Sequence, residues 1–220
     1  LDFEANAKDG YGTDWPIRYA DIAPWYSYAE KFAGISGSKE NIPVLPDGDF
    51  LPPMEMNVLE KHIAKRVEAH YKGGRRIIIG RVAHLTVPHN GRGACQFRNR
   101  CERGCPFGAY FSSNSATLPA AKATGNLTIR PYSIVHSIIY DEQKQRATGV
   151  KIIDTETMQT YDYYAKIIFC NASTLGSASI LLNSTSNRFP NGLGNDSGQL
   201  GHNLMDHHYG VGAYGDTDDF

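Results

Sequence analysis

Several features that would place a chain in a functional class are missing from this sequence of 220 residues. Neither sign of charge dominates, because 22 Lys and Arg residues oppose 23 Asp and Glu residues and leave a formal net charge of -1. This balance gives no bulk attraction to nucleic acid or to an anionic membrane, and no basic stripe adds one locally. No apolar run is long enough to span a membrane. We therefore predict no nucleic-acid partner and no membrane span in this segment.

The start of the chain is equally poor in signals. It has no initiator Met, and residues 1–10 have neither the basic start nor the apolar centre of a signal peptide. We expect the chain to begin inside a longer protein, so no leader indicates its compartment. What is present is the composition of a globular protein, with 41% hydrophobic residues, enough for a core in one or two domains.

The first third of the chain predicts two helices and a strand. The earlier helix is expected to hold Pro24 in its first turn and to end at Gly34. One of its faces carries Trp25, Tyr28, Ala29, Phe32 and Ala33. We interpret this face as core packing, and exposed aromatic rings that stack on sugars are the alternative. Apolar residues at spacings of three and four predict the later helix over 56–71, and a short strand is expected over 75–82.

Three of the four cysteines lie close together in a loop. Cys95, Cys101 and Cys105 form a C-x5-C-x3-C pattern, whereas Cys170 lies far off in the sequence. The loop also carries Arg92, Arg98, Arg100 and Arg103. Three cysteines cannot all pair with one another, so they form one disulfide and a free thiol, ligate a cluster that needs three thiolates, or remain reduced. The spacing matches no zinc site built from C-x2-C pairs.

The second half of the chain is rich in β-strand signals. Alternating segments with turn residues between them predict strands over 127–130, 134–140, 147–154 and 158–164. We expect 134–139 and 147–153 to pair as adjacent antiparallel strands of a meander. The apolar run that ends at Cys170 is expected in a different, mostly parallel sheet.

A strand, a small-residue turn and a helix are predicted over 166–184. The small residues are Asn171, Ala172, Ser173 and Thr174, and either Ser173 or Thr174 is a candidate helix cap. In open α/β sheets such a turn builds a crevice in which helix-end amides meet an anionic group, which favours a nucleotide-type ligand. A turn of the same composition that binds nothing is the alternative.

A second polar cluster lies near the end of the chain. Asp206 is followed directly by His207 and His208. This arrangement suggests a metal ligand pair or a general base, but spacing places no third ligand, so a hydrogen-bonded turn is the alternative.

Taken together, these motifs resemble the glucose-methanol-choline (GMC) oxidoreductases, which depend on FAD. Residues 197–207, Ser-Gly-Gln-Leu-Gly-His-Asn-Leu-Met-Asp-His, are similar to the family's G-x-x-G-x-N-L-x-D-H stretch. The Trp-Pro pair at Trp15, the Gly-Cys-Pro turn at Cys105 and the segments 126–135, 147–150 and 166–184 follow in the family's order. The resemblance covers nearly the whole chain.

The resemblance implies an α/β fold with α+β elements. It divides the chain into a substrate-domain (cap) segment with the cysteine loop over 1–110, part of a Rossmann-like FAD-binding domain with its β-meander over 111–200, and the start of the substrate-domain sheet over 201–220. It implies FAD contacts from Val135, Asn171, Ala172, Ser173, Asn203, Asp206 and His207.

Within the family, the chain is most similar to flavoprotein subunits of bacterial sugar and sugar-acid dehydrogenases. Several of these carry an iron–sulfur cluster on three cysteines, which implies Cys95, Cys101 and Cys105 as ligands. The expected partners are a small carbohydrate substrate and a cytochrome- or quinone-linked electron-acceptor subunit, in the bacterial periplasm or cytoplasm.

Two motifs of the family are not in the chain. One is the G-x-G-x-x-G fingerprint, whose helix end binds the FAD pyrophosphate, and the other is the carboxy-terminal catalytic His-His or His-Asn pair. We therefore expect the middle of an enzyme that oxidises a secondary alcohol of a sugar, glycoside or sugar acid by hydride transfer to flavin, with its catalytic residues outside this chain. A non-catalytic binding or structural domain that keeps the family's fold is the alternative.

Overall fold

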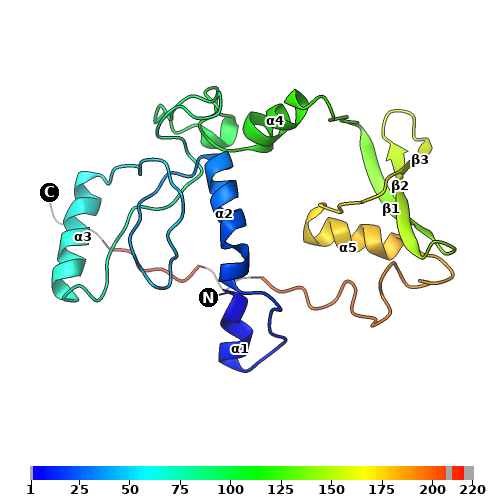
Figure 1. Cartoon of the computed structure of the whole chain (residues 1–220), viewed down its shortest axis with the longest axis horizontal. Coiled ribbons are helices and arrows are strands. Elements are labelled where there is room, and N and C mark those ends of the chain that lie inside the picture. Colours follow the sequence, from blue (N-terminus) through cyan, green and yellow to red (C-terminus); the bar gives the residue numbers. More distant parts are fainter. Residues whose placement is uncertain (1, 207–209, 216–220) are drawn as a thin grey trace. The chain divides into compact units, whose positions relative to one another are not determined.

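The computed structural model describes residues 2–206 and 210–215, and it divides the chain into two compact units between Leu127 and Thr128 (Figure 1). The first unit contains η1 (Asp2–Glu4), α1 (Ala5–Asp9), α2 (Tyr19–Ala33), α3 (Val58–His70), η2 (Cys101–Arg103), the π-helical turn η3 (Ser113–Thr117) and α4 (Leu118–Ala123). The second contains β1 (Ser133–Asp141), β2 (Arg146–Asp154), β3 (Thr160–Tyr164) and α5 (Ser173–Asn183). Within the described residues, no helix combines the length and apolar character needed to cross a membrane.

Helix α2 begins earlier than the sequence indicates. The backbone N–H of Arg18 donates to Asp21 Oδ2 at 2.7 Å, which fixes the helix start at Tyr19. Pro24 therefore lies inside the helix, and its expected place in the first turn is wrong. Trp25 is 69% exposed, which overturns the interpretation of its face as core. The spacing of the residues identified an apolar face on this helix. It could not show whether another segment packs against that face.

The carboxyl end of α2 is tied to the turn over 89–92. Gly34 ends the helix with φ 75°, as predicted, and donates its N–H to Glu30 O at 2.9 Å. The last carbonyl oxygens of the helix receive side chains from the turn. His89 Nε2 lies 2.6 Å from Lys31 O, Asn90 Nδ2 donates to Phe32 O at 3.2 Å, and Arg92 Nη2 donates to Ala33 O at 2.5 Å. These bonds satisfy carbonyls that have no partner within the helix.

Helix α3 confirms the prediction over 56–71 and shows why it starts where it does. The Asn57 side chain accepts from the Glu60 N–H at 2.8 Å, while Glu60 Oε2 accepts from the Asn57 N–H at 2.7 Å. This reciprocal capping box satisfies two N–H groups at the helix start. The strand expected over 75–82 is wrong except for a bridge between Ser36 and Val82. A strand needs a hydrogen-bonding partner along its length, and the described residues offer segment 76–81 none.

The core of the first unit forms where four chain segments meet. Ser36 exchanges backbone hydrogen bonds with Val82 at 2.9 and 3.0 Å, and Leu51 N–H donates to Ile35 O at 2.7 Å. Leu85 N–H donates to Ala109 O at 3.0 Å, and the Leu85 side chain is completely buried. This small core holds both ends of the cysteine loop.

The second unit is built on the predicted meander. The sheet has the order β1-β2-β3, with every pair antiparallel, and Ile138 lies opposite Val150. This confirms the pairing of 134–139 with 147–153. The expected strand over 127–130 is absent from the described structure, since no neighbouring strand is present there to pair with it.

Helix α5 packs on β1, one of the two edge strands of this sheet. Ser184, at the end of the helix, is 3% exposed, and its Oγ accepts from Ile138 N–H at 2.7 Å and donates to Ile180 O at 2.6 Å. The Ser184 hydroxyl thus accepts a hydrogen bond from a backbone N–H that the edge strand would otherwise leave without a partner.

The segment 166–170 is not a strand, so its expected place in a parallel sheet is wrong. Ile167 is 72% and Phe169 80% exposed. An apolar run forms a buried strand only when neighbouring strands and covering helices are present. The part of the chain that the structure describes supplies neither a neighbouring strand nor a covering helix for this segment. Its apolar side chains are therefore exposed to solvent.

Candidate functional site

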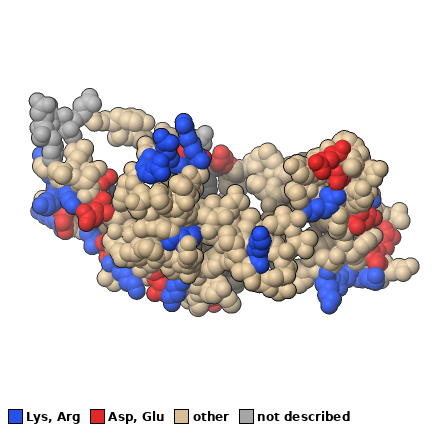
Figure 2. Space-filling model, turned by 90° about the horizontal axis from the view of Figure 1, so that it is seen from above, with Lys and Arg blue, Asp and Glu red and all other residues tan. Residues whose placement is uncertain are grey.

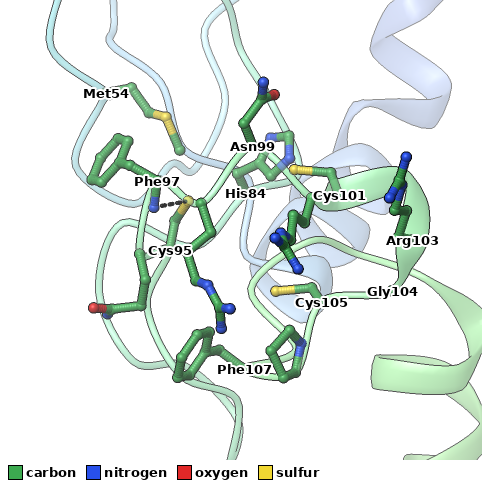
Figure 3. A pocket seen from close by; sticks show the side chains of 14 residues that line it. Met54, His84, Cys95, Phe97, Asn99, Cys101, Arg103, Gly104, Cys105 and Phe107 are labelled. Carbon is green, nitrogen blue, oxygen red and sulfur yellow. Dashed lines mark hydrogen bonds between the residues drawn. The ribbon is translucent and has the colours of Figure 1, made fainter.

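A cavity of about 550 Å³ lies inside the cysteine loop (Figure 3). Its wall includes all three clustered cysteines, Cys95, Cys101 and Cys105, which therefore lie around one space. The other side chains on the wall include Met54, His84, Phe97, Arg98, Arg100, Arg103 and Phe107. The cavity wall thus combines aromatic rings and sulfur atoms with the side chains of three arginines.

The backbone fixes each cysteine in a different way. Cys95 follows directly from the core, because its N–H donates to Leu85 O at 2.8 Å. Cys101 begins the short turn η2, which Gly104 ends with φ 88°. Cys105 starts a tight turn in which Gly108 N–H donates to Cys105 O at 3.0 Å. Phe97 has φ 50°, a conformation that bulky residues rarely adopt, so the surrounding loop holds the backbone there.

The cysteines are free, half-buried thiols, and no disulfide joins them. Hydrogen bonds from the backbone N–H groups of Tyr110, Phe107, Ala109 and Gly108 lower the pKa of the Cys105 thiol, with Tyr110 contributing most, and they outweigh the opposing effect of burial. Cys95 Sγ accepts a further hydrogen bond from the Phe97 N–H at 3.4 Å. At Cys105 the pocket therefore favours the thiolate, which is the form that ligates metals.

Within residues 2–206 and 210–215, no three His, Cys, Asp or Glu side chains approach closely enough to hold a single metal ion. In an iron–sulfur cluster, each thiolate binds a different iron, so the sulfur ligands stand farther apart than around one ion. Three thiols on one cavity wall, amides directed at sulfur and nearby arginines fit such a cluster chemically.

The residues expected to contact FAD lie in the second unit. Val135 is on β1, and Asn171, Ala172 and Ser173 are exposed where α5 begins. Ala172, not Ser173 or Thr174, is the N-cap, and no side chain caps the helix, so that expectation is wrong. Ser173 has φ 61°, which leaves its side chain outside the capping geometry.

The remaining predicted contacts lie beyond the regular elements. Asn203 and Asp206 are exposed in a segment without helix or strand, and Asn203 Nδ2 donates to Gln199 Oε1 at 2.9 Å. His207 and His208 lie outside the described residues, so the metal or general-base hypothesis for this cluster stays a prediction.

The second unit exposes apolar side chains close in sequence to the predicted FAD contacts. They are Ile129, Tyr132, Ile134, Ile167, Phe169 and Leu175. Exposed apolar side chains together with an uncapped helix start suit a cofactor that has a flat ring system and polar groups. By contrast, Figure 2 shows charged side chains of both signs scattered among wide uncharged areas, without a continuous surface of one sign on the face in view.

Sequence reasoning missed several members of the cysteine pocket. His84 and Met54 reach it from segments that no spacing rule connects with the cysteines. A usable signal did exist for the amides around Cys105, because Gly104-Cys105-Pro106 and Gly108 mark a tight turn that directs N–H groups inward.

The family model described as GMC oxidoreductase matches residues 15–209. The chain is 32% identical over 215 residues to 2-methyl-1,2-propanediol dehydrogenase from Mycolicibacterium austroafricanum. This aligned region covers 94% of the chain and 37% of that protein. It is 27% identical over 208 residues to the fructose dehydrogenase large subunit of Gluconobacter japonicus, covering 94% and 37%. It is 28% identical over 215 residues to paromamine 6'-oxidase from Streptomyces fradiae, covering 93% and 37%.

The chain thus spans rather more than a third of the length of these relatives. The family match extends through α2, the cysteine loop, the meander and α5, and it includes every predicted site residue. It agrees with the motifs read from the sequence and with the mixed helices and three-stranded antiparallel sheet of the structure. The chain belongs to the GMC oxidoreductases, whose N-terminal domain is a Rossmann-like FAD-binding fold.

Proposed function

We propose that the chain is part of an FAD-dependent dehydrogenase that oxidises a secondary CH–OH group of a sugar, glycoside or sugar acid. The family match over residues 15–209 carries this proposal. Its relatives include, by name, a fructose dehydrogenase subunit and an oxidase of paromamine, alongside a diol dehydrogenase. The bound flavin would accept hydride from the substrate carbon, while a base outside this chain takes the hydroxyl proton.

In this proposal, the second unit supplies cofactor contacts. Val135 on β1 would offer apolar surface to the nucleotide, and the residues at the start of α5, Asn171, Ala172 and Ser173, would offer backbone N–H groups to its polar atoms. Asn203, Asp206 and His207 are proposed to contact the cofactor from the other family motif. The predicted assignment of 1–110 and 201–220 to the substrate domain is kept as part of the proposal.

The first unit is proposed to pass electrons onward. Cys95, Cys101 and Cys105 would each give one thiolate to an iron–sulfur cluster in the cavity, and the arginines of the loop would offset its negative charge. When bound, the cluster supplies one-electron transfer to an external acceptor, which we propose is a cytochrome- or quinone-linked subunit. The free thiols and the lowered pKa of Cys105 support this proposal.

The test uses the full-length protein purified without oxygen. Bound flavin, its bleaching by a sugar or sugar acid, and about three iron atoms per chain are the expected results. Cys101→Ser should lose the iron and the reduction of an external acceptor but keep flavin bleaching, because hydride transfer does not pass through the cluster.

The matched control is Cys170→Ser, which removes a thiol from the other unit and should keep the iron. A protein that binds flavin and bleaches with sugars but contains no iron would refute the cluster alone. A protein that binds neither flavin nor iron would favour the non-catalytic domain.

A further inference from the structure

One nitrogen atom of the cysteine pocket is buried without a partner. Nε2 of His84 is closed to solvent and makes no hydrogen bond within the described structure. His84 lines the cavity together with the three cysteines, and its side chain is labelled among those that line the cavity in Figure 3. Buried polar atoms almost always have a hydrogen-bonding partner, so a lone one indicates a group that is absent from the protein alone.

The His84 ring is held in place from two sides. Its backbone pairs with Tyr110 in an antiparallel bridge, and the two rings lie 5.0 Å apart with 38° between their planes. The next residue, Leu85, is anchored to Ala109 in the buried core. Because Tyr110 also directs its N–H at Cys105, the imidazole and the thiol share one rigid support.

We propose that His84 is a positioning residue whose Nε2–H donates a hydrogen bond to a sulfur atom of the iron–sulfur cluster and thereby raises the cluster's reduction potential. This inference rests on the cluster proposed above. A neutral imidazole carries one N–H, and sulfur is the acceptor that the occupied pocket would offer. A hydrogen bond to sulfur stabilises the reduced, more negative cluster, and such bonds are among the features that set cluster potentials.

The experiment compares His84→Phe, which keeps a ring against Tyr110 but has no N–H, with His84→Gln, whose amide can still donate. Tyr110→Phe is the control, because it keeps the ring and the backbone N–H. The cluster's midpoint potential is measured in the full-length protein by a redox titration followed by electron paramagnetic resonance, with iron content measured beside it. We expect His84→Phe to shift the potential to a more negative value, whereas His84→Gln and Tyr110→Phe stay close to the wild type.

Substrate bleaching of the flavin should be unchanged in His84→Phe, while electron transfer to the external acceptor slows. An iron-loaded His84→Phe with the wild-type potential would overturn the role of His84 and leave the cluster intact. If His84→Phe fails to load iron, the iron-loaded His84→Gln variant decides. A midpoint potential near the wild-type value supports the hydrogen bond, and a potential as negative as that expected for His84→Phe refutes it. A wild-type protein without iron would overturn the cluster and this role with it.

Discussion

Replacing Ser184 by Ala should separate α5 from the sheet edge that it covers. The Ser184 Oγ accepts from Ile138 N–H at 2.7 Å and donates to Ile180 O at 2.6 Å, at a site that is 3% exposed. Alanine leaves the Ile138 N–H buried without a partner, which costs about 1–3 kcal/mol, and loses a second bond worth about 1 kcal/mol. The expected loss is about 2–4 kcal/mol, or roughly a 30- to 700-fold rise in the opening equilibrium.

Hydrogen exchange of the native full-length protein measures this effect at single amides. The Ile138 amide should lose protection in Ser184→Ala, and its neighbours on β1 should follow. Ser177→Ala is the control on the same helix, because Ser177 Oγ reaches Cys170 O only at 3.5 Å, where a hydrogen bond is weak. Equal protection of Ile138 in the two variants would show that Ser184 does not hold the edge strand.

Two further changes test the stability of the two units. Gly34→Ala should cost about 2–4 kcal/mol of unfolding free energy in a urea titration, because φ is 75° and a Cβ would lie 2.4 Å from Leu85 Cδ2. Gly73→Ala is the control: its φ is 78° but nothing lies within reach of a Cβ, so it should cost only about 1–2 kcal/mol. Equal costs would contradict the predicted clash. The pKa of Asp154 is lowered from 3.8 to about 2, chiefly by the Thr157 backbone N–H and then by an arginine. Its stabilising contribution is therefore complete above about pH 4 and is lost as the pH falls toward 2. Asp154→Asn should flatten this part of an acid titration followed by circular dichroism, and an unchanged acid limb would refute the assignment.

The sequence predicted best the elements whose signals are local. The meander followed from alternation and short turns, and α3 from the apolar residues at spacings of three and four. Segment 166–170 has an equally clear apolar signal, yet a strand depends on a partner that its own residues cannot specify. The same limit explains Trp25, since periodicity shows that a face is apolar but not what covers it.

The candidate site divides in the same way. The three cysteines of the C-x5-C-x3-C pattern line one pocket, because a short loop keeps them together. His84 enters the pocket only because the segment after Val82 pairs with the segment around Tyr110. Such a contact depends on tertiary hydrogen bonds, and no motif in the sequence records it.

The three side chains that cap the end of α2 make that helix and the cysteine loop a single cooperative unit. Lys31, Phe32 and Ala33 offer their carbonyls to the turn over 89–92, and the chain reaches Cys95 only three residues after that turn. Opening either part breaks the same bonds, so the two should exchange amide hydrogens at a common rate. A contact made on the exposed aromatic side of α2 should therefore change the free energy of the loop that holds the three thiols.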